Sequence, residues 1–103
     1  MSHDFEQLLK QIDREAKAEG PHAVAELKAL QVKYRMLNQL IVARRELHLT
    51  QKQLAQRAGL GQAEVSKIER GRKSPTLETY SRLAAALNLD VPPLARRRRT
   101  RAA

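Results

Sequence analysis

The sequence predicts an all-α fold, and three observations support this prediction. Apolar residues recur at spacings of three and four, the period of a helix, and hardly ever at the spacing of two that is typical of a strand. Glycine and proline divide the 103 residues into runs of helical length. Only three residues are aromatic and none is cysteine, so the core must be aliphatic and free of disulfides.

Two helices are expected in the first half of the chain. The first runs from about Phe5 to Ala18, and Gly20-Pro21 ends it. Pro21 then suits the start of a second helix, where its missing N–H costs nothing. No helix breaker follows before His48, so this helix would be about 40 Å long, longer than a small domain can cover. Its apolar stripe consists of Val24, Leu27, Leu30, Tyr34, Leu37 and Ile41.

Two short helices joined by a glycine turn are expected next. Thr50 and Gln53 match the capping box that starts a helix, and Gly59 can adopt the left-handed conformation that ends it. The following helix begins after Gly61 and is closed by Gly71. The side chains expected to face inward are Leu54, Ala55, Ala58, Val65 and Ile68.

A fifth helix and a basic tail complete the expected organisation. Pro75-Thr76 opens the helix and Asn88 ends it, with Leu77, Tyr80, Leu83, Ala84 and Leu87 facing inward. Val91 and Leu94 are expected to fold back on the core. Residues 95–103 are rich in arginine and poor in apolar residues, which predicts disorder.

Positive charge is concentrated in the part of the chain that holds the two short helices. Residues 1–34 carry six acidic and five basic side chains, whereas residues 35–103 carry five acidic and fifteen basic ones. Five of these arginines belong to the tail, yet residues 35–95 still have a net charge of +5. Basic charge in one segment indicates a polyanionic partner. Two packed helices joined by a short turn form a helix-turn-helix, whose second helix can enter the major groove of DNA.

The stretch ARRELHLTQKQLAQRAGLGQAEVSKIERGRKSPTLETYSRLAAALNL resembles the phage-repressor type of helix-turn-helix, the Cro/C1 or XRE family. The resemblance covers about residues 37 to 91. It implies a five-helix DNA-binding domain and a palindromic double-stranded DNA operator. It also implies that bases are read by Gln62, Ala63, Ser66 and Lys67. Phosphates would be bound by Gln51, Arg70, Arg72 and Lys73, and Arg44 and Glu69 would form an orienting pair.

One residue departs from the family pattern, and one is ambiguous. Gly61 stands where Ser or Thr usually leads the second helix of the motif, so a hydroxyl that could touch phosphate is absent. Glu64 also points out of this helix. It could accept a hydrogen bond from a cytosine amino group, or it could only repel nearby phosphate.

Residues 1–36 form a helical extension that a free-standing repressor domain would not need. A long helix leading into the motif resembles the arrangement of HigA-type antitoxins. That resemblance implies a protein partner, a small basic toxin that is a ribonuclease of the RelE/HigB-like class. We also expect a homodimer, because the two recognition helices of a two-fold dimer would face one side of the duplex. The surface expected to bind the protein partner consists of Phe5, Leu8, Leu9, Ile12, Val24, Leu27, Leu30 and Tyr34. The apolar stripe from Val24 to Tyr34 could instead be core, covered by the first helix. The N-terminal helices could also serve only for dimerisation in a stand-alone XRE-family regulator.

The expected organisation is therefore an extension over residues 1–36, a DNA-binding domain over 37–94 and a disordered tail over 95–103. The tail could be a phosphate-binding arm, a minor-groove arm or an inert end. No paired carboxylates, phosphate-binding loop or nucleophile–base pair stands out, so we expect no enzyme activity, no cofactor and no metal site. With no apolar run of about 20 residues and no signal segment, we expect a cytoplasmic repressor that controls its own promoter.

Overall fold

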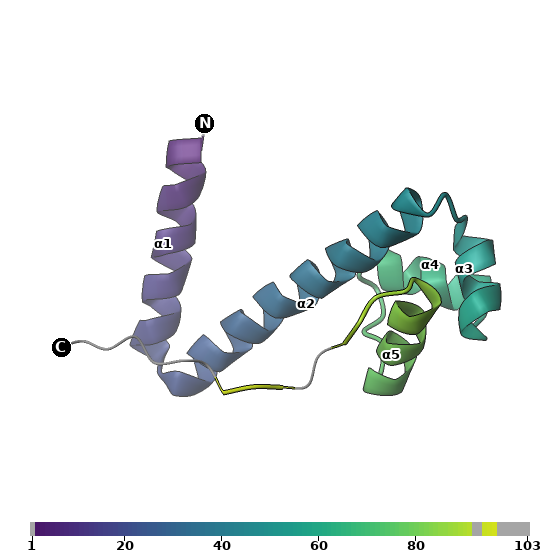
Figure 1. The fold of residues 1–103 in the computed structure, drawn as a ribbon. Coiled ribbons are helices and arrows are strands. Elements are labelled where there is room, and N and C mark those ends of the chain that lie inside the picture. The colour runs from purple at the N-terminus through teal and green to yellow at the C-terminus, as the bar shows by residue number, and fades with distance from the viewer. Residues whose placement is uncertain (1, 92–93, 97–103) are drawn as a thin grey trace. The chain divides into compact units, whose positions relative to one another are not determined.

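The computed structural model describes residues 2–91 and 94–96, and within these ranges the protein is all helical (Figure 1). The helices are α1 (Ser2–Glu19), α2 (Pro21–Glu46), α3 (Gln51–Ala58), α4 (Gln62–Glu69) and α5 (Leu77–Ala86). The prediction of an all-α fold with five helices is confirmed, as is the order of an N-terminal helical extension followed by a helix-turn-helix. None of the helices in the described ranges combines the length and the apolar composition that a membrane-spanning helix needs.

The chain divides into two compact units, Met1–Val42 and Ala43–Ala103. Helix α2 continues without a break from the first unit into the second. The boundary predicted between residues 36 and 37 therefore lies inside a helix. The division into an extension over residues 1–36 and a DNA-binding domain over 37–94 stays a prediction.

The first unit contains α1 and most of α2, joined by Gly20 at a backbone φ of 121°. Ala16 and Ala23 are buried where the two helices meet at this turn. Beyond the turn, most of the larger apolar side chains are open to solvent, because α1 and α2 diverge (Figure 1). Of the residues expected to bind a partner, Val24 and Leu27 are half-buried, and the exposed ones are Phe5, Leu8, Leu9, Ile12, Leu30 and Tyr34.

The second unit has a small aliphatic core. Leu54 from α3, Val65 and Ile68 from α4, and Leu83 from α5 are each only 1% exposed. Because α3 packs against both α4 and α5, these side chains fill the space between the three helices. Every side chain expected to face inward from α3 and α4 is buried, so this part of the prediction is confirmed.

Three expectations about apolar side chains were wrong, those for Leu77, Val91 and Leu94. Near the C-terminal end of α2, Leu40 is buried while Ile41 is only half-buried. A stripe of apolar residues at spacings of three and four drifts around a long helix when its average spacing differs from the 3.6-residue period of the helix. Leu77 is 77% exposed, since it lies at the free end of α5 and at the edge of the buried stripe. Val91 and Leu94 are exposed and do not fold back on the core.

The ends of α5 are otherwise as expected. Thr76 caps the helix by accepting a hydrogen bond from the backbone N–H of Thr79, and Asn88 follows the helix in the left-handed conformation. Leu83, Ala84 and Leu87 are buried and Tyr80 is half-buried. In the tail, Ala95 and Arg96 are exposed. The expected disorder of residues 97–103 falls outside the described residues.

Candidate nucleic-acid interface

Local sequence signals fix the start of α3. The Thr50 hydroxyl accepts a hydrogen bond from the backbone N–H of Gln53 at 3.0 Å. The Gln53 side chain in turn accepts one from the backbone N–H of Thr50 at 2.9 Å. This reciprocal capping box satisfies two N–H groups that the first turn of a helix leaves without partners. The capping prediction is confirmed, and the entry of the chain into the motif is defined.

Gly59 makes the turn between α3 and α4. Its φ of 71° lies in the left-handed region, which side chains other than glycine rarely adopt. A Cβ atom at this position would also lie 2.9 Å from a guanidinium nitrogen of Arg82, which reaches over the turn from α5. The conformation of Gly59 was predicted. The role of Arg82 in covering the turn was not, because residues 59 and 82 are far apart in the sequence.

Helix α4 buries one side and exposes the other. Val65 and Ile68 face the core, while Gln62, Ala63 and Lys67 are exposed and Ser66 is half-buried. The four residues expected to read bases therefore lie on the part of α4 turned away from the core. Gly61 precedes them with extended backbone and, among the described residues, no atom lies within 4 Å of the place that its Cβ would take.

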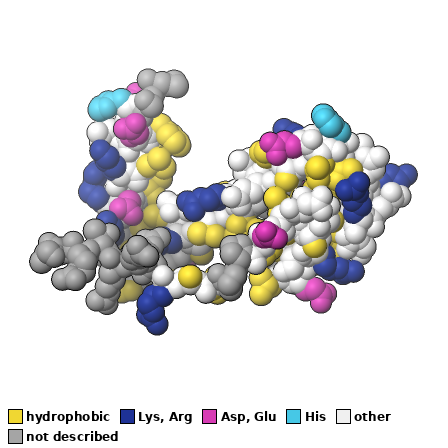
Figure 2. Space-filling view, in the orientation of Figure 1, with side chains coloured by type: hydrophobic (Ala, Val, Ile, Leu, Met, Phe, Trp, Pro, Cys, Tyr) yellow, Lys and Arg dark blue, Asp and Glu magenta, His cyan; other side chains and the backbone are white. Residues whose placement is uncertain are grey.

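The loop after α4 folds back over the end of that helix. The backbone N–H groups of Arg72 and Lys73 both donate to the carbonyl of Lys67, at 2.9 and 3.3 Å. The side chains of Arg70, Arg72 and Lys73 are exposed. The structure thus brings the basic residues expected to bind phosphate next to the residues expected to read bases. Figure 2 shows several Lys and Arg side chains at the surface of the second unit.

A hydrogen-bonded network centred on Glu69 holds the motif together. Arg44 donates from Nε and Nη2 to the two carboxylate oxygens of Glu69, at 2.7 and 3.0 Å. Its Nη1 donates to the carbonyl of Leu49 at 2.8 Å. Gln51 donates from Nε2 to Glu69 at 3.0 Å. The side chains of Arg44 and Glu69 are only 12% and 9% exposed, so this bidentate ion pair is largely shielded from water.

The network links the last turn of α2, the first turn of α3 and the last turn of α4. The sequence suggested the contact between Arg44 and Glu69, but assigned Gln51 to phosphate alone. No local pattern could reveal the bond between Gln51 and Glu69, since 18 residues separate them. The amide nitrogen of Gln51 carries two N–H groups, so one donor remains for a phosphate.

A second ion pair lies beside the exposed face of α4. Lys73 donates from Nζ to a carboxylate oxygen of Glu64 at 3.2 Å. The sequence placed Lys73 against phosphate and left Glu64 ambiguous, without pairing the two. Within the described ranges, no group of three or more His, Asp or Glu side chains could hold a metal ion.

The fold and this surface define a class: proteins that bind DNA through a helix-turn-helix. A helix-turn-helix family profile matches residues 40–94, just over half of the chain. An uncharacterised HTH-type transcriptional regulator of Haemophilus influenzae is 34% identical over 71 residues, which cover 67% of this chain and 72% of that protein. The chain belongs to this family of helix-turn-helix transcriptional regulators.

Two other relatives are similar over shorter stretches. The 10 kDa protein of the immF control region of Bacillus phage phi105 is 42% identical over 48 residues, and an uncharacterised HTH-type regulator of Sinorhizobium fredii is 46% identical over 47 residues. The matches cover 47% and 46% of this chain, and 53% and 61% of those proteins. No solved structure matches the chain significantly.

Proposed function

We propose that this regulator is a sequence-specific repressor that binds a two-fold operator as a homodimer. The observation that carries the proposal is the exposed face of α4, with Gln62 and Lys67 beside the basic loop that begins at Arg70. The network around Glu69 supports it, because a reading helix must be held in a fixed orientation. In a two-fold dimer the two copies of α4 would read half-sites about one helical turn apart.

Salt dependence is the first test of this proposal. A dimer that contacts about six to ten phosphates should lose on the order of a thousandfold or more in affinity between 50 and 200 mM salt. Fluorescence anisotropy with a duplex recovered by binding-site selection measures this loss. A flat titration would contradict the proposal. Deleting residues 96–103 should reduce the slope and leave the selected sequence unchanged if the tail contacts only phosphate.

The second test separates the side chains that read bases from those that bind phosphate. Gln62→Ala and Lys67→Ala should each weaken binding by about 1–3 kcal/mol at one operator position and relax the base preference there. Gln51→Ala and Arg72→Ala should weaken binding to all sequences alike, since phosphate contacts position the protein without reading sequence. A selection that returns the unchanged motif at full strength for Gln62→Ala would refute the assignment of α4 as the reading helix.

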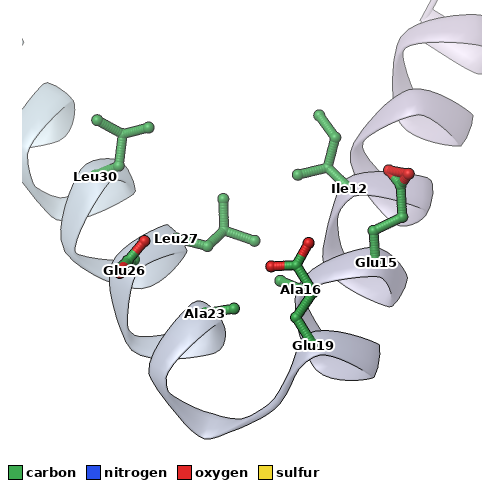
Figure 3. Close-up of a pocket in the computed structure, with 8 residues that line it drawn as sticks. All are labelled: Ile12, Glu15, Ala16, Glu19, Ala23, Glu26, Leu27 and Leu30. Carbon is green, nitrogen blue, oxygen red and sulfur yellow. The ribbon is translucent and has the colours of Figure 1, made fainter.

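A groove in the first unit supports a second role, as the antitoxin of a toxin–antitoxin pair. Ile12 of α1 and Leu27 and Leu30 of α2 point into a groove of about 480 Å³ between these helices (Figure 3). Three carboxylates, those of Glu15, Glu19 and Glu26, also line it. Along α1 the apolar face continues through Phe5, Leu8 and Leu9, all exposed; Figure 2 shows hydrophobic side chains gathered along one side of this helix.

An apolar surface lined by acidic groups is suited to a basic partner with apolar anchors at helical spacing. We therefore propose that residues 1–36 capture a small basic toxin, a ribonuclease of the RelE/HigB-like class, and that the complex represses its own operon. The carboxylates of the groove disfavour a dimer in which two copies of the groove face each other, because that contact would bring like charges together.

Matched substitutions in the full chain distinguish the two roles. Leu30→Asp changes a groove residue that is 48% exposed, and Val32→Asp changes an apolar residue of α2 that is 45% exposed and does not line the groove. The assays are co-purification with a small basic protein encoded next to this gene, where the gene neighbourhood contains one, rescue of cells that express that protein, and operator binding. Loss of rescue for Leu30→Asp alone, with operator binding retained, supports the antitoxin role. Loss of operator binding as well would favour dimerisation.

A further inference from the structure

Glu64 is an acidic residue on the helix proposed to enter DNA. It is the third residue of α4 and follows Gln62 and Ala63 directly. Its side chain is 29% exposed, and its carboxylate accepts a hydrogen bond from Nζ of Lys73, whose side chain is 50% exposed. A carboxylate in this position repels phosphate, so its presence on a DNA-reading surface requires a physical explanation.

The backbone accounts for the meeting of Glu64 and Lys73. The N–H of Lys73 donates to the carbonyl of Lys67 and returns the loop to α4. Residues three and four apart are neighbours on a helix surface, so Glu64 lies one turn before Lys67 on the same side. The flexible Lys73 side chain can reach the carboxylate from there, or it can swing outward to a phosphate.

We propose that Glu64 is a specificity-determining residue that acts as an internal counter-ion for Lys73. On non-operator DNA, where attraction to phosphate supplies essentially all of the affinity, the carboxylate neutralises Lys73 and repels the duplex. At the operator, contacts to base edges hold α4 in one position, so that one phosphate stays beside Lys73 and displaces the carboxylate. Glu64 thus lowers the affinity of the protein for non-operator DNA more than its affinity for the operator. This inference rests on the proposed role of α4 as the reading helix.

The test compares Glu64→Gln with Glu78→Gln in the full-length protein. Both substitutions remove one negative charge, but Glu78 is an exposed residue in the first turn of α5. Two duplexes of equal length are titrated over a range of salt concentrations: the selected operator and a scrambled sequence. Circular dichroism of each variant verifies that the helices are retained.

Glu64→Gln should bind the scrambled duplex about five- to tenfold more tightly per protomer at 0.1 M salt, because it gains about one phosphate contact. The slope of log affinity against log salt on that duplex should steepen by about 0.9 per protomer. On the operator the gain should be about threefold or less, if one phosphate already pairs with Lys73 there. Glu78→Gln should change both duplexes equally and by a smaller factor.

A double-mutant comparison tests the coupling itself. Lys73→Gln should weaken binding to the scrambled duplex little in the wild-type background and strongly in the Glu64→Gln background. Equal effects in the two backgrounds, or identical behaviour of Glu64→Gln and Glu78→Gln, would overturn the inference. So would a changed base preference of Glu64→Gln in a binding-site selection, because Glu64 would then read a base directly. A wild-type protein without any sequence preference would refute the proposed function instead.

Discussion

Replacing Glu69 with glutamine should destabilise the second unit strongly. The substitution keeps the shape of the side chain but replaces the carboxylate, whose oxygens accept two hydrogen bonds from Arg44 and one from Gln51, with a neutral amide. Arg44 would then be left largely buried without its counter-ion. Removing one partner of a buried pair costs about 3–5 kcal/mol. Because the two side chains keep 12% and 9% exposure, we expect a loss of about 2–4 kcal/mol in the free energy of unfolding.

This loss is large for so small a unit. At about 0.05–0.15 kcal/mol per residue, a unit of this size should have a free energy of unfolding of only about 3–9 kcal/mol. Urea denaturation followed by circular dichroism measures the change, and amide exchange at Leu54 and Ile68 reports on the core directly. Glu78→Gln is the control, since it removes an exposed carboxylate. A loss below about 0.5 kcal/mol, the level of an exposed pair, would refute the reasoning. The double variant Arg44→Met, Glu69→Met should be less destabilised than Glu69→Gln.

Two further predictions concern packing and turn geometry, each measured by the same denaturation assay. Leu83→Ala should lower the free energy of unfolding by about 2–5 kcal/mol, because it opens a cavity in the core. Leu77→Ala should change the free energy of unfolding by less than about 0.5 kcal/mol, since the Leu77 side chain is 77% exposed. Gly59→Ala should destabilise the second unit by about 1 kcal/mol or more, because residue 59 has a positive φ and its Cβ would contact Arg82. Gly61→Ser should stabilise the second unit by a few tenths of a kcal/mol, because the serine side chain would cap α4. Equal stabilities within either pair would contradict these assignments.

The features that sequence reasoning captured are mostly local. The capping box at Thr50 and Gln53 involves residues three positions apart, and the left-handed conformation of Gly59 follows from its place at the end of a helical run. The buried faces of α3 and α4 follow from the helical period over only eight residues each. In such short elements a periodic pattern has little length over which to drift.

The features that it did not capture depend on where distant residues meet. The burial of Leu40 rather than Ile41 reflects the accumulated rotation along the 26 residues of α2. The bonds from Gln51 to Glu69 and from Lys73 to Glu64 join residues 18 and nine positions apart. They depend on the packing angle of α3 and on the path of the loop after α4, neither of which the sequence pattern specifies.

Gly61 leaves the start of α4 without a side chain, and this affects how the regulator can diverge in evolution. Gly61 has an ordinary negative φ of −80°, and among the described residues nothing within 4 Å would obstruct a side chain there. A single nucleotide change in its codon can therefore introduce a new polar group beside the reading surface while the core stays intact. If α4 reads the operator, duplicated copies of the gene can acquire new target sites through position 61 before any buried residue has to change.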